Sequence, residues 1–348
     1  MTNDTQNATR VTKETKNKIR VEFERTSLWE RMKIKYLSLR FLGRVVFVIF
    51  RVVLLLGISY IILYPFITKI AGSFMSPEDF ADVTVKLISR NPTLDTYKAI
   101  IEYNHYFDAA LTTLGVSLVS ALAQMIACCV IAYGFAKYKF KGSKFLFFCV
   151  VFTMVVPHQT IKSALSLKFR YFDIGVYNFG IIKLFTGGQS LNLLDTYWPM
   201  VILSLTGLAF KNGLYIFMLR QFFKGIPDSL EESAYIDGSG VFRTFVQIIL
   251  PLSVPMLITV FLFAFSWQWT DNFYVSIFFP GREQYVFTKI LTVPAPFREA
   301  VNQAGGSLFN QAIMNTCAIM IILPLVVVYL FCQRFLIQGI ERSGITGE

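Results

Sequence analysis

Long apolar runs alternate with short polar stretches along most of this chain. Several runs exceed the ~20 residues that a helix needs to cross a ~30 Å hydrocarbon layer. A surface helix of a soluble protein would interrupt such runs with a polar face. We therefore predict an all-α integral membrane protein with about six transmembrane helices. The expected spans cover residues 45 or 52 to 70, 111–133, 145–167, 198–219, 248–267 and 312–331.

Three residues interrupt these spans. Arg51 lies within the first apolar run, and its long side chain can snorkel to the membrane interface. Pro157 breaks the third span, and Pro324 predicts a kink in the last one, because proline removes a helical hydrogen bond.

The positions of the basic residues predict the orientation in the membrane. Lys and Arg crowd the N-terminal region, the loops at 137–144 and 220–243, and the C-terminal tail. Loops rich in Lys and Arg stay on the cytoplasmic side, so both termini are expected to be cytoplasmic. The outer loops, 75–106, 168–197 and 271–308, are long enough to form a docking surface for another protein.

These patterns divide the chain into three parts. Residues 1–44 form a basic cytoplasmic extension, residues 45–340 the transmembrane domain, and residues 341–348 a cytoplasmic tail. Between residues 21 and 44, apolar and basic residues interleave, which indicates an amphipathic helix on the inner membrane surface. A cytosolic helix packed against a partner is the alternative.

Composition argues against several other functions. Hydrophobic residues make up 54% of the 348 residues and charged residues only 16%, unlike a soluble domain. The net charge of +11 lies in termini and loops, which argues for a membrane topology and against nucleic-acid binding. Two histidines, and five cysteines without metal-ligand spacing, predict no metal site. No phosphate-binding glycine loop or catalytic motif is found, so we expect no catalytic residue, no cofactor and no ATP hydrolysis by this chain.

The loop at 221–251 predicts a folded element of its own. Pro227 suits the first turn of a helix, and Ser229 and Glu232 have the spacing of a capping box. Gly238 and Gly240 are expected to end this helix, because glycine adopts the left-handed conformation at low cost. A compact helix–turn–helix of this kind suits a transporter whose ATPase is a separate protein, since exposed carboxylates can pair with basic groups of the ATPase. An ordinary solvated hairpin is the alternative reading.

The residues of this loop resemble a known motif. E-E-S-A-Y-I-D-G-S-G, followed by I-I-L-P, is similar to the EAA loop of permease subunits in type I ABC importers, with Ser233 where alanine is usual. The resemblance implies that the loop at 226–240 couples the chain to the ATPase. The residues to which it assigns this coupling are Leu230, Glu231, Glu232, Ser233, Ala234, Asp237, Gly238, Leu250 and Pro251.

Further matches extend the resemblance over nearly all of the chain after residue 44. The stretches 91–97, 132–142, 219–223 and 269–273 are similar to the smaller permease subunit of maltose-type systems. The resemblance implies that residues 45–340 are the permease domain of an ATP-driven sugar importer and form half of its translocation pathway. The implied partners are a second, nonidentical permease subunit, a cytoplasmic ATPase dimer, an extracytoplasmic sugar-binding protein and the lipid of a bacterial or archaeal cell membrane.

Six residues are candidates for a substrate pathway. A charge within an apolar span is costly and usually functional, which singles out Lys211 and its neighbour Asn212. An ion pair with a neighbouring helix, or snorkelling, is the alternative for the lysine. At the outer end of the fifth span, aromatic planes and polar groups suit a sugar, although aromatic residues also populate membrane interfaces. These residues are Trp267, Trp269, Asp271 and Asn272.

A secondary transporter of a polar solute, acting without an ATPase, is the second hypothesis. It would need coupling-ion sites and usually internal repeats, and neither is visible in the sequence. A membrane-bound enzyme is a third possibility, but the sequence shows no cluster of catalytic residues.

Overall fold

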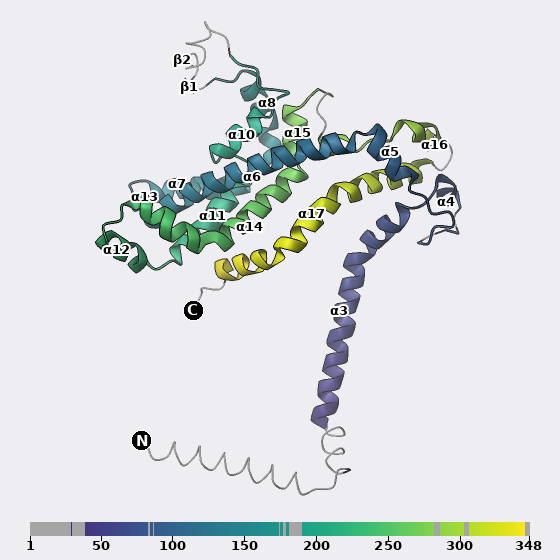
Figure 1. Cartoon of the computed structure of the whole chain (residues 1–348), viewed down its shortest axis with the longest axis horizontal. Coiled ribbons are helices and arrows are strands. Elements are labelled where there is room, and N and C mark those ends of the chain that lie inside the picture. Colours follow the sequence, from purple (N-terminus) through teal and green to yellow (C-terminus); the bar gives the residue numbers. More distant parts are fainter. Residues whose placement is uncertain are drawn as a thin grey trace. The chain divides into compact units, whose positions relative to one another are not determined.

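The computed structural model describes residues 29, 39–82, 84–85, 87–173, 175–176, 179–180, 190–281, 286–302 and 306–344. The chain divides into two units, residues 1–68 and 69–348. Figure 1 labels the helices of both units in chain order.

The first unit contains most of the long helix α3, Leu39–Gly72. Its residues Gly43–Gly72 are apolar enough and long enough to cross a membrane. The helix continues through Arg51, so the first span includes the earlier of its two predicted starts. The amphipathic helix predicted between residues 21 and 44 lies mostly outside the described residues and stays a prediction.

Three more apolar helices in the second unit are long enough to span a membrane. They are α6, Tyr106–Lys137, the stretch Val241–Trp269 that ends in α14, Leu250–Trp269, and most of α17, Gly306–Gly344. Among the described residues, four helices in all can cross a membrane, or five if one bent pair is a single span. The six predicted spans therefore correspond to four continuous helical stretches, one bent pair and one broken segment. Helix α17 continues through Pro324.

The bent pair is the third predicted span. Helix α7, Ser143–Val155, ends before Pro157, and the chain resumes as the 3-10 turn η1, His158–Ile161, and helix α8, Lys162–Arg170. The two halves meet at 98°. Proline disfavours a helical conformation in the residue before it, and Val156 is extended, so the break occurs at the predicted residue.

The fourth predicted span is not one continuous helix. Helix α10, Trp198–Leu205, and helix α11, Asn212–Lys224, are separated by residues 206–211. Gly207 adopts a left-handed conformation, with φ of +74°, and the N–H groups of Leu208 and Ala209 both donate to the carbonyl of Leu203. This glycine turn ends α10, and its signal in the sequence was a single glycine within an apolar run.

Helix α6 is the centre of the second unit. It packs against α14, α11 and α10, while α17 packs against α14, and α7 against α11. Small side chains on α6 are buried in these contacts, among them Ala121, Cys128 and Ala132. Helices in membranes associate mainly by close van der Waals packing, which small residues permit, because lipid tails are as apolar as the side chains and the hydrophobic effect contributes little. The largest wholly buried side chains here include Tyr215 and Phe223 of α11.

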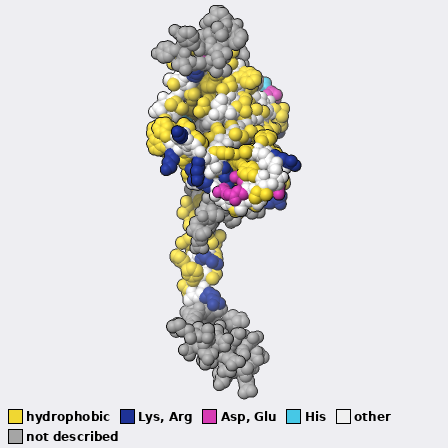
Figure 2. Space-filling model, turned by 90° about the vertical axis from the view of Figure 1, so that its left-hand side faces the viewer, with side chains coloured by type: hydrophobic (Ala, Val, Ile, Leu, Met, Phe, Trp, Pro, Cys, Tyr) yellow, Lys and Arg dark blue, Asp and Glu magenta, His cyan; other side chains and the backbone are white. Residues whose placement is uncertain are grey.

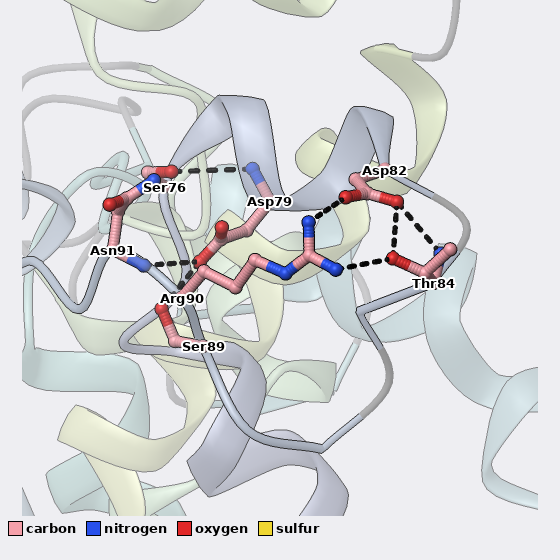
Figure 3. Close-up of polar contacts among 7 residues, drawn as sticks. All are labelled: Ser76, Asp79, Asp82, Thr84, Ser89, Arg90 and Asn91. Carbon is pink, nitrogen blue, oxygen red and sulfur yellow. Dashed lines mark hydrogen bonds and ion pairs between the residues drawn. The ribbon is translucent and has the colours of Figure 1, made fainter.

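The segment between α3 and α6 is held together by polar contacts (Figure 3). The hydroxyl of Ser76 caps helix α4, Pro77–Ala81, by accepting a hydrogen bond from the N–H of Asp79. The carboxylate of Asp79 accepts from the hydroxyl of Ser89, and Arg90 donates to Asp82 at 2.7 Å. Helix α5, Asp95–Tyr103, follows and contacts the start of α17 through Ile100, which is fully buried.

The remaining elements are short. Beyond the bent pair, strands β1, Gly175–Val176, and β2, Phe179–Gly180, form an antiparallel ribbon. Helix α15, Phe273–Phe278, follows α14, and η3, Phe287–Lys289, η4, Ala295–Phe297, and α16, Arg298–Asn302, precede α17. Between α11 and α14 lie α12, Asp228–Ile236, α13, Val241–Thr244, and a π-helical turn η2, Phe245–Ile249.

Candidate functional site

The helix–turn–helix predicted between the fourth and fifth spans is present as α12 and α13. Gly238 has φ of +82°, and the N–H of Ser239 donates to the carbonyl of Ala234 at 2.9 Å. A side chain at Gly238 would meet no atom within 4 Å, so the backbone conformation is what requires glycine there. The predicted glycine end of the first helix is confirmed at Gly238, whereas Gly240 has φ of −77° and precedes α13 instead.

The predicted capping box at the start of this helix is wrong. Helix α12 begins at Asp228, with Pro227 as the N-cap and no side-chain cap hydrogen bond. Ser229 therefore lies inside the helix, where its carbonyl accepts from the hydroxyl of Ser233 at 2.8 Å. The fixed φ of proline already sets the direction of the chain into the helix.

The hairpin is bound to the C-terminal end of α6. The Lys137 ammonium donates to the carbonyl of Ile226 at 2.8 Å and to Oδ1 of Asp228 at 2.6 Å. The hydroxyl of Tyr133 donates to Oε1 of Glu231 at 3.1 Å. The hydrogen bond from Lys137 and its positive charge hold the pKa of Asp228 below its usual value. These contacts fix the start of α12 to a helix that runs through the second unit.

The outer face of the hairpin combines apolar and acidic side chains. Among the residues assigned to coupling, Glu232 and Asp237 are exposed, whereas Glu231 is buried and accepts a hydrogen bond from Tyr133. Ile236 and Phe242 are the most exposed apolar side chains of the hairpin, at 86% and 79%. Figure 2 views the end of the second unit that carries α12, where acidic side chains gather between Lys and Arg side chains. Sequence reasoning missed the apolar part of this face, whose signal was a hydrophobic residue on either side of the glycine turn.

Leu250 and Pro251 lie apart from this face. They stand at the start of α14 and, with Met125 and Val130 of α6, line an apolar groove of about 420 Å³. The π-helical turn separates these two residues from the hairpin, so they do not lie on the face predicted to contact the ATPase.

A second feature is a cavity of about 200 Å³ between α6, α11 and α14. It brings together four of the six predicted pathway residues, namely Lys211, Trp267, Asp271 and Asn272. The Lys211 ammonium lies 4.2 Å from the ring centre of Phe210 and 4.1 Å from that of Trp267. Cation–π attraction holds the ammonium between these two rings.

The other two predicted residues do not line this cavity. Asn212 is wholly buried at the start of α11, and within the described part of the chain its amide has no hydrogen-bond partner. Trp269 donates from its ring N–H to the carbonyl of Ile321 at 2.8 Å, which ties α14 to α17. A buried indole needs such a partner, so this tryptophan stabilises a helix contact instead.

The cavity lies beside the break between α10 and α11, and this break contacts the one at Pro157. His158, just after the Pro157 break, contacts the ring of Phe210, which lies in the break between α10 and α11. The N–H of Phe210 in turn donates to the Tyr274 hydroxyl at 2.7 Å. Discontinuous membrane helices expose backbone and polar side chains, and transporters place substrate sites at such points. The sequence signals were Pro157 and Gly207.

Some polar groups on the cavity wall form hydrogen bonds within the chain, and others lack a partner among the described residues. Asp271 is engaged, because Oδ1 accepts from the N–H groups of Phe273 at 3.0 Å and Tyr274 at 3.2 Å. Tyr215 is fully buried on the wall, and its hydroxyl has no partner among the described residues. Gln124 lines the cavity and donates to Ser204 at 3.4 Å. Within the ranges that the structure describes, no three His, Cys, Asp or Glu side chains are grouped to hold a metal ion.

The chain is similar to known proteins in both sequence and structure. Residues 124–342 match the family described as binding-protein-dependent transport system inner membrane component. The chain is 27% identical to the polygalacturonan/rhamnogalacturonan transport system permease protein YtcP of Bacillus subtilis (strain 168), over 84% of this chain and 96% of that protein. It is also 27% identical to the maltodextrin transport system permease protein MalD of Streptococcus pneumoniae (strain ATCC BAA-255 / R6), over 84% and 93%.

A solved structure shares the fold. A chain of a bacterial ABC transporter involved in the import of the acidic polysaccharide alginate aligns with a TM-score of 0.62 and 21% identity. The alignment covers 84% of this chain and 97% of that one.

Proposed function

Because the chain belongs to the family of binding-protein-dependent transport system inner membrane components, we propose that it is the permease subunit of an ATP-driven carbohydrate importer. The observation that carries the proposal is that α6 contacts both the hairpin and the cavity. Its C-terminal end holds the hairpin through Tyr133 and Lys137, and its middle lines the cavity through Gln124. One rigid helix therefore connects a surface on which a partner can act with a chamber that can hold a small polar molecule.

A carbohydrate suits this chamber chemically. The rings of Trp267 and Phe210 offer flat apolar faces, and Gln124, Gln268 and Asn272 offer amide donors and acceptors at its edges. Sugars present the complementary surfaces, with apolar ring faces and hydroxyls around the rim. The similarity to carbohydrate permeases named for polygalacturonan and maltodextrin supports the same class of cargo here.

The hairpin suits an ATPase contact. Its exposed Ile236 and Phe242 can enter a cleft of a partner, while Glu232 and Asp237 can pair with basic groups around that cleft. Two ATPase subunits would serve two permeases, of which this chain is one and a nonidentical subunit the other. Each permease would then form half of the translocation pathway.

Transport would follow alternating access between an inward-open and an outward-open state. Closure of the ATPase dimer shifts α12, and the Lys137 and Tyr133 contacts pass this shift to α6. The walls of the cavity then separate on the opposite side, where an extracytoplasmic sugar-binding protein delivers its cargo. The hairpin and both chain termini lie on the cytoplasmic side in this scheme, in the cell membrane of a bacterium or archaeon.

The test is uptake of labelled oligosaccharide by cells that co-express the chain with its neighbouring permease, ATPase and binding-protein genes. Uptake should require the partner ATPase and should stop when the nucleotide-binding lysine of that ATPase is replaced. Uptake by this chain alone, driven by an ion gradient, would instead support a secondary transporter.

A further inference from the structure

The cavity between α6, α11 and α14 contains a cation that the described part of the chain does not neutralise. Lys211 has no Asp or Glu oxygen within 4.0 Å of its ammonium among the described residues. Its contacts are the rings of Phe210 and Trp267, which hold it at the cavity wall without removing its charge. An ammonium without a counter-charge in a membrane-spanning segment is unfavourable, and it attracts an anionic group.

Asp271, the one carboxylate among the described residues of the cavity wall, forms hydrogen bonds with backbone N–H groups instead. Both oxygens of Asp271 accept hydrogen bonds from the N–H of Tyr274, and Oδ1 also accepts from the N–H of Phe273. These donors lie at the start of α15, so the carboxylate closes the turn between α14 and α15. It is not placed as the ion-pair partner of Lys211.

A second group on the same wall also lacks a partner. Tyr215 is wholly buried, and its hydroxyl forms no hydrogen bond with any described residue. A buried hydroxyl without a partner costs free energy unless a ligand or water satisfies it. That oxygen is inaccessible from the cavity, so the ammonium of Lys211 is the group that a ligand can reach.

We infer that this cavity selects an anionic saccharide, a uronate, whose carboxylate pairs with the ammonium of Lys211 while its ring stacks on Trp267. The inference rests on the proposed function and makes its cargo more specific. A charge-assisted hydrogen bond to a carboxylate is stronger than one to a neutral hydroxyl. A neutral sugar would fill the same space but leave the ammonium without a counter-charge.

Matched pairs of trisaccharides test this assignment in cells that express the whole transporter. Each pair consists of a neutral sugar and its uronate, built on glucose, galactose or mannose, so that the pair differs only in CH₂OH or carboxylate at C6. We expect uptake of a uronate member. Lys211→Met should lower that uptake by about tenfold or more, since a hydrogen bond between charged groups is lost. Lys211→Arg should keep most of it, because the positive charge remains.

The control is Lys69→Met, which removes an exposed lysine in the last turn of α3, outside the predicted docking loops, and should leave uptake unchanged. Copurification of the partner ATPase shows whether each variant assembles. Uptake of neutral members only would overturn the inference and leave the proposed function standing. Unchanged uronate uptake in Lys211→Met would also overturn it, as would failure of both lysine variants to assemble, which would identify Lys211 as a charge pair with another subunit. Uptake of no member at all would contradict the proposed function itself.

Discussion

The ammonium of Lys137, the last residue of α6, lies 2.6 Å from Oδ1 of Asp228, the first residue of α12. The Lys137 side chain is only 6% exposed, although its partner carboxylate faces solvent. A second hydrogen bond, to the carbonyl of Ile226, fixes the same ammonium from the other side of the Pro227 turn. The lysine thus joins the beginning of the hairpin to the helix that borders the cavity.

Lys137→Met should uncouple ATP hydrolysis from transport. The apolar side chain keeps the length of the lysine but loses both hydrogen bonds, so a shift of α12 is no longer passed to α6. We expect uptake to fall several-fold while the copurified ATPase still hydrolyses ATP. Lys141→Met is the control, because Lys141 is exposed in the loop that follows α6. Equal loss of uptake in both variants would mean that loop charge, and not the contact to α12, matters.

Tyr133→Phe should loosen the hairpin by removing the hydrogen bond to Glu231. The carboxylate is buried, so leaving it without this donor should cost about 1–3 kcal/mol. Hydrogen exchange of α12 in the purified complex measures the effect as faster exchange of its amides. Tyr329→Phe, at an exposed position of α17, should leave the same amides unchanged. Unaltered exchange in Tyr133→Phe would show that other contacts suffice to hold the hairpin.

Gly238→Ala and Gly240→Ala should differ, although a new side chain meets open space at both positions. Gly238 has φ of +82°, where a Cβ atom costs about 1–2 kcal/mol, whereas Gly240 has φ of −77°. We expect weaker binding of the ATPase and lower uptake for the first variant only. Gly238→Asn should lie between alanine and glycine, because asparagine tolerates this conformation. Gly238→Trp adds bulk on the proposed contact face and should abolish transport without preventing membrane insertion.

Cysteine labelling tests the orientation. Lys141→Cys, in the loop before α7, should react with a membrane-impermeant reagent only after the cells are opened. Ile88→Cys, which is 86% exposed in the segment between α3 and α6, should react in intact cells. The unmodified chain gives the background from its native cysteines. The opposite pattern would place both termini outside the cytoplasm.

Much of this architecture could be predicted, because it follows from local patterns. Pro157 marks a break that the structure places there, and Gly238 marks the end of α12. The break between α10 and α11 was harder, because one glycine in an apolar run is compatible with a continuous helix. The roles of Glu231 and Trp269 could not be predicted at all. Each depends on a partner distant in sequence, Tyr133 in one case and Ile321 in the other.

The π-helical turn at Phe245–Ile249 sets the rotational phase of α14. A π turn contains one residue more than an α turn needs, and one residue corresponds to about 100° of rotation around a helix axis. Deleting one residue there would yield a regular α turn that still presents Trp267 and Gln268 to the cavity, whereas deleting one residue of α14 before Trp267 would turn both side chains by about 100°. Single-residue deletions should therefore be tolerated between Phe245 and Ile249 but not between Leu250 and Trp267, a difference that a library of length variants would reveal.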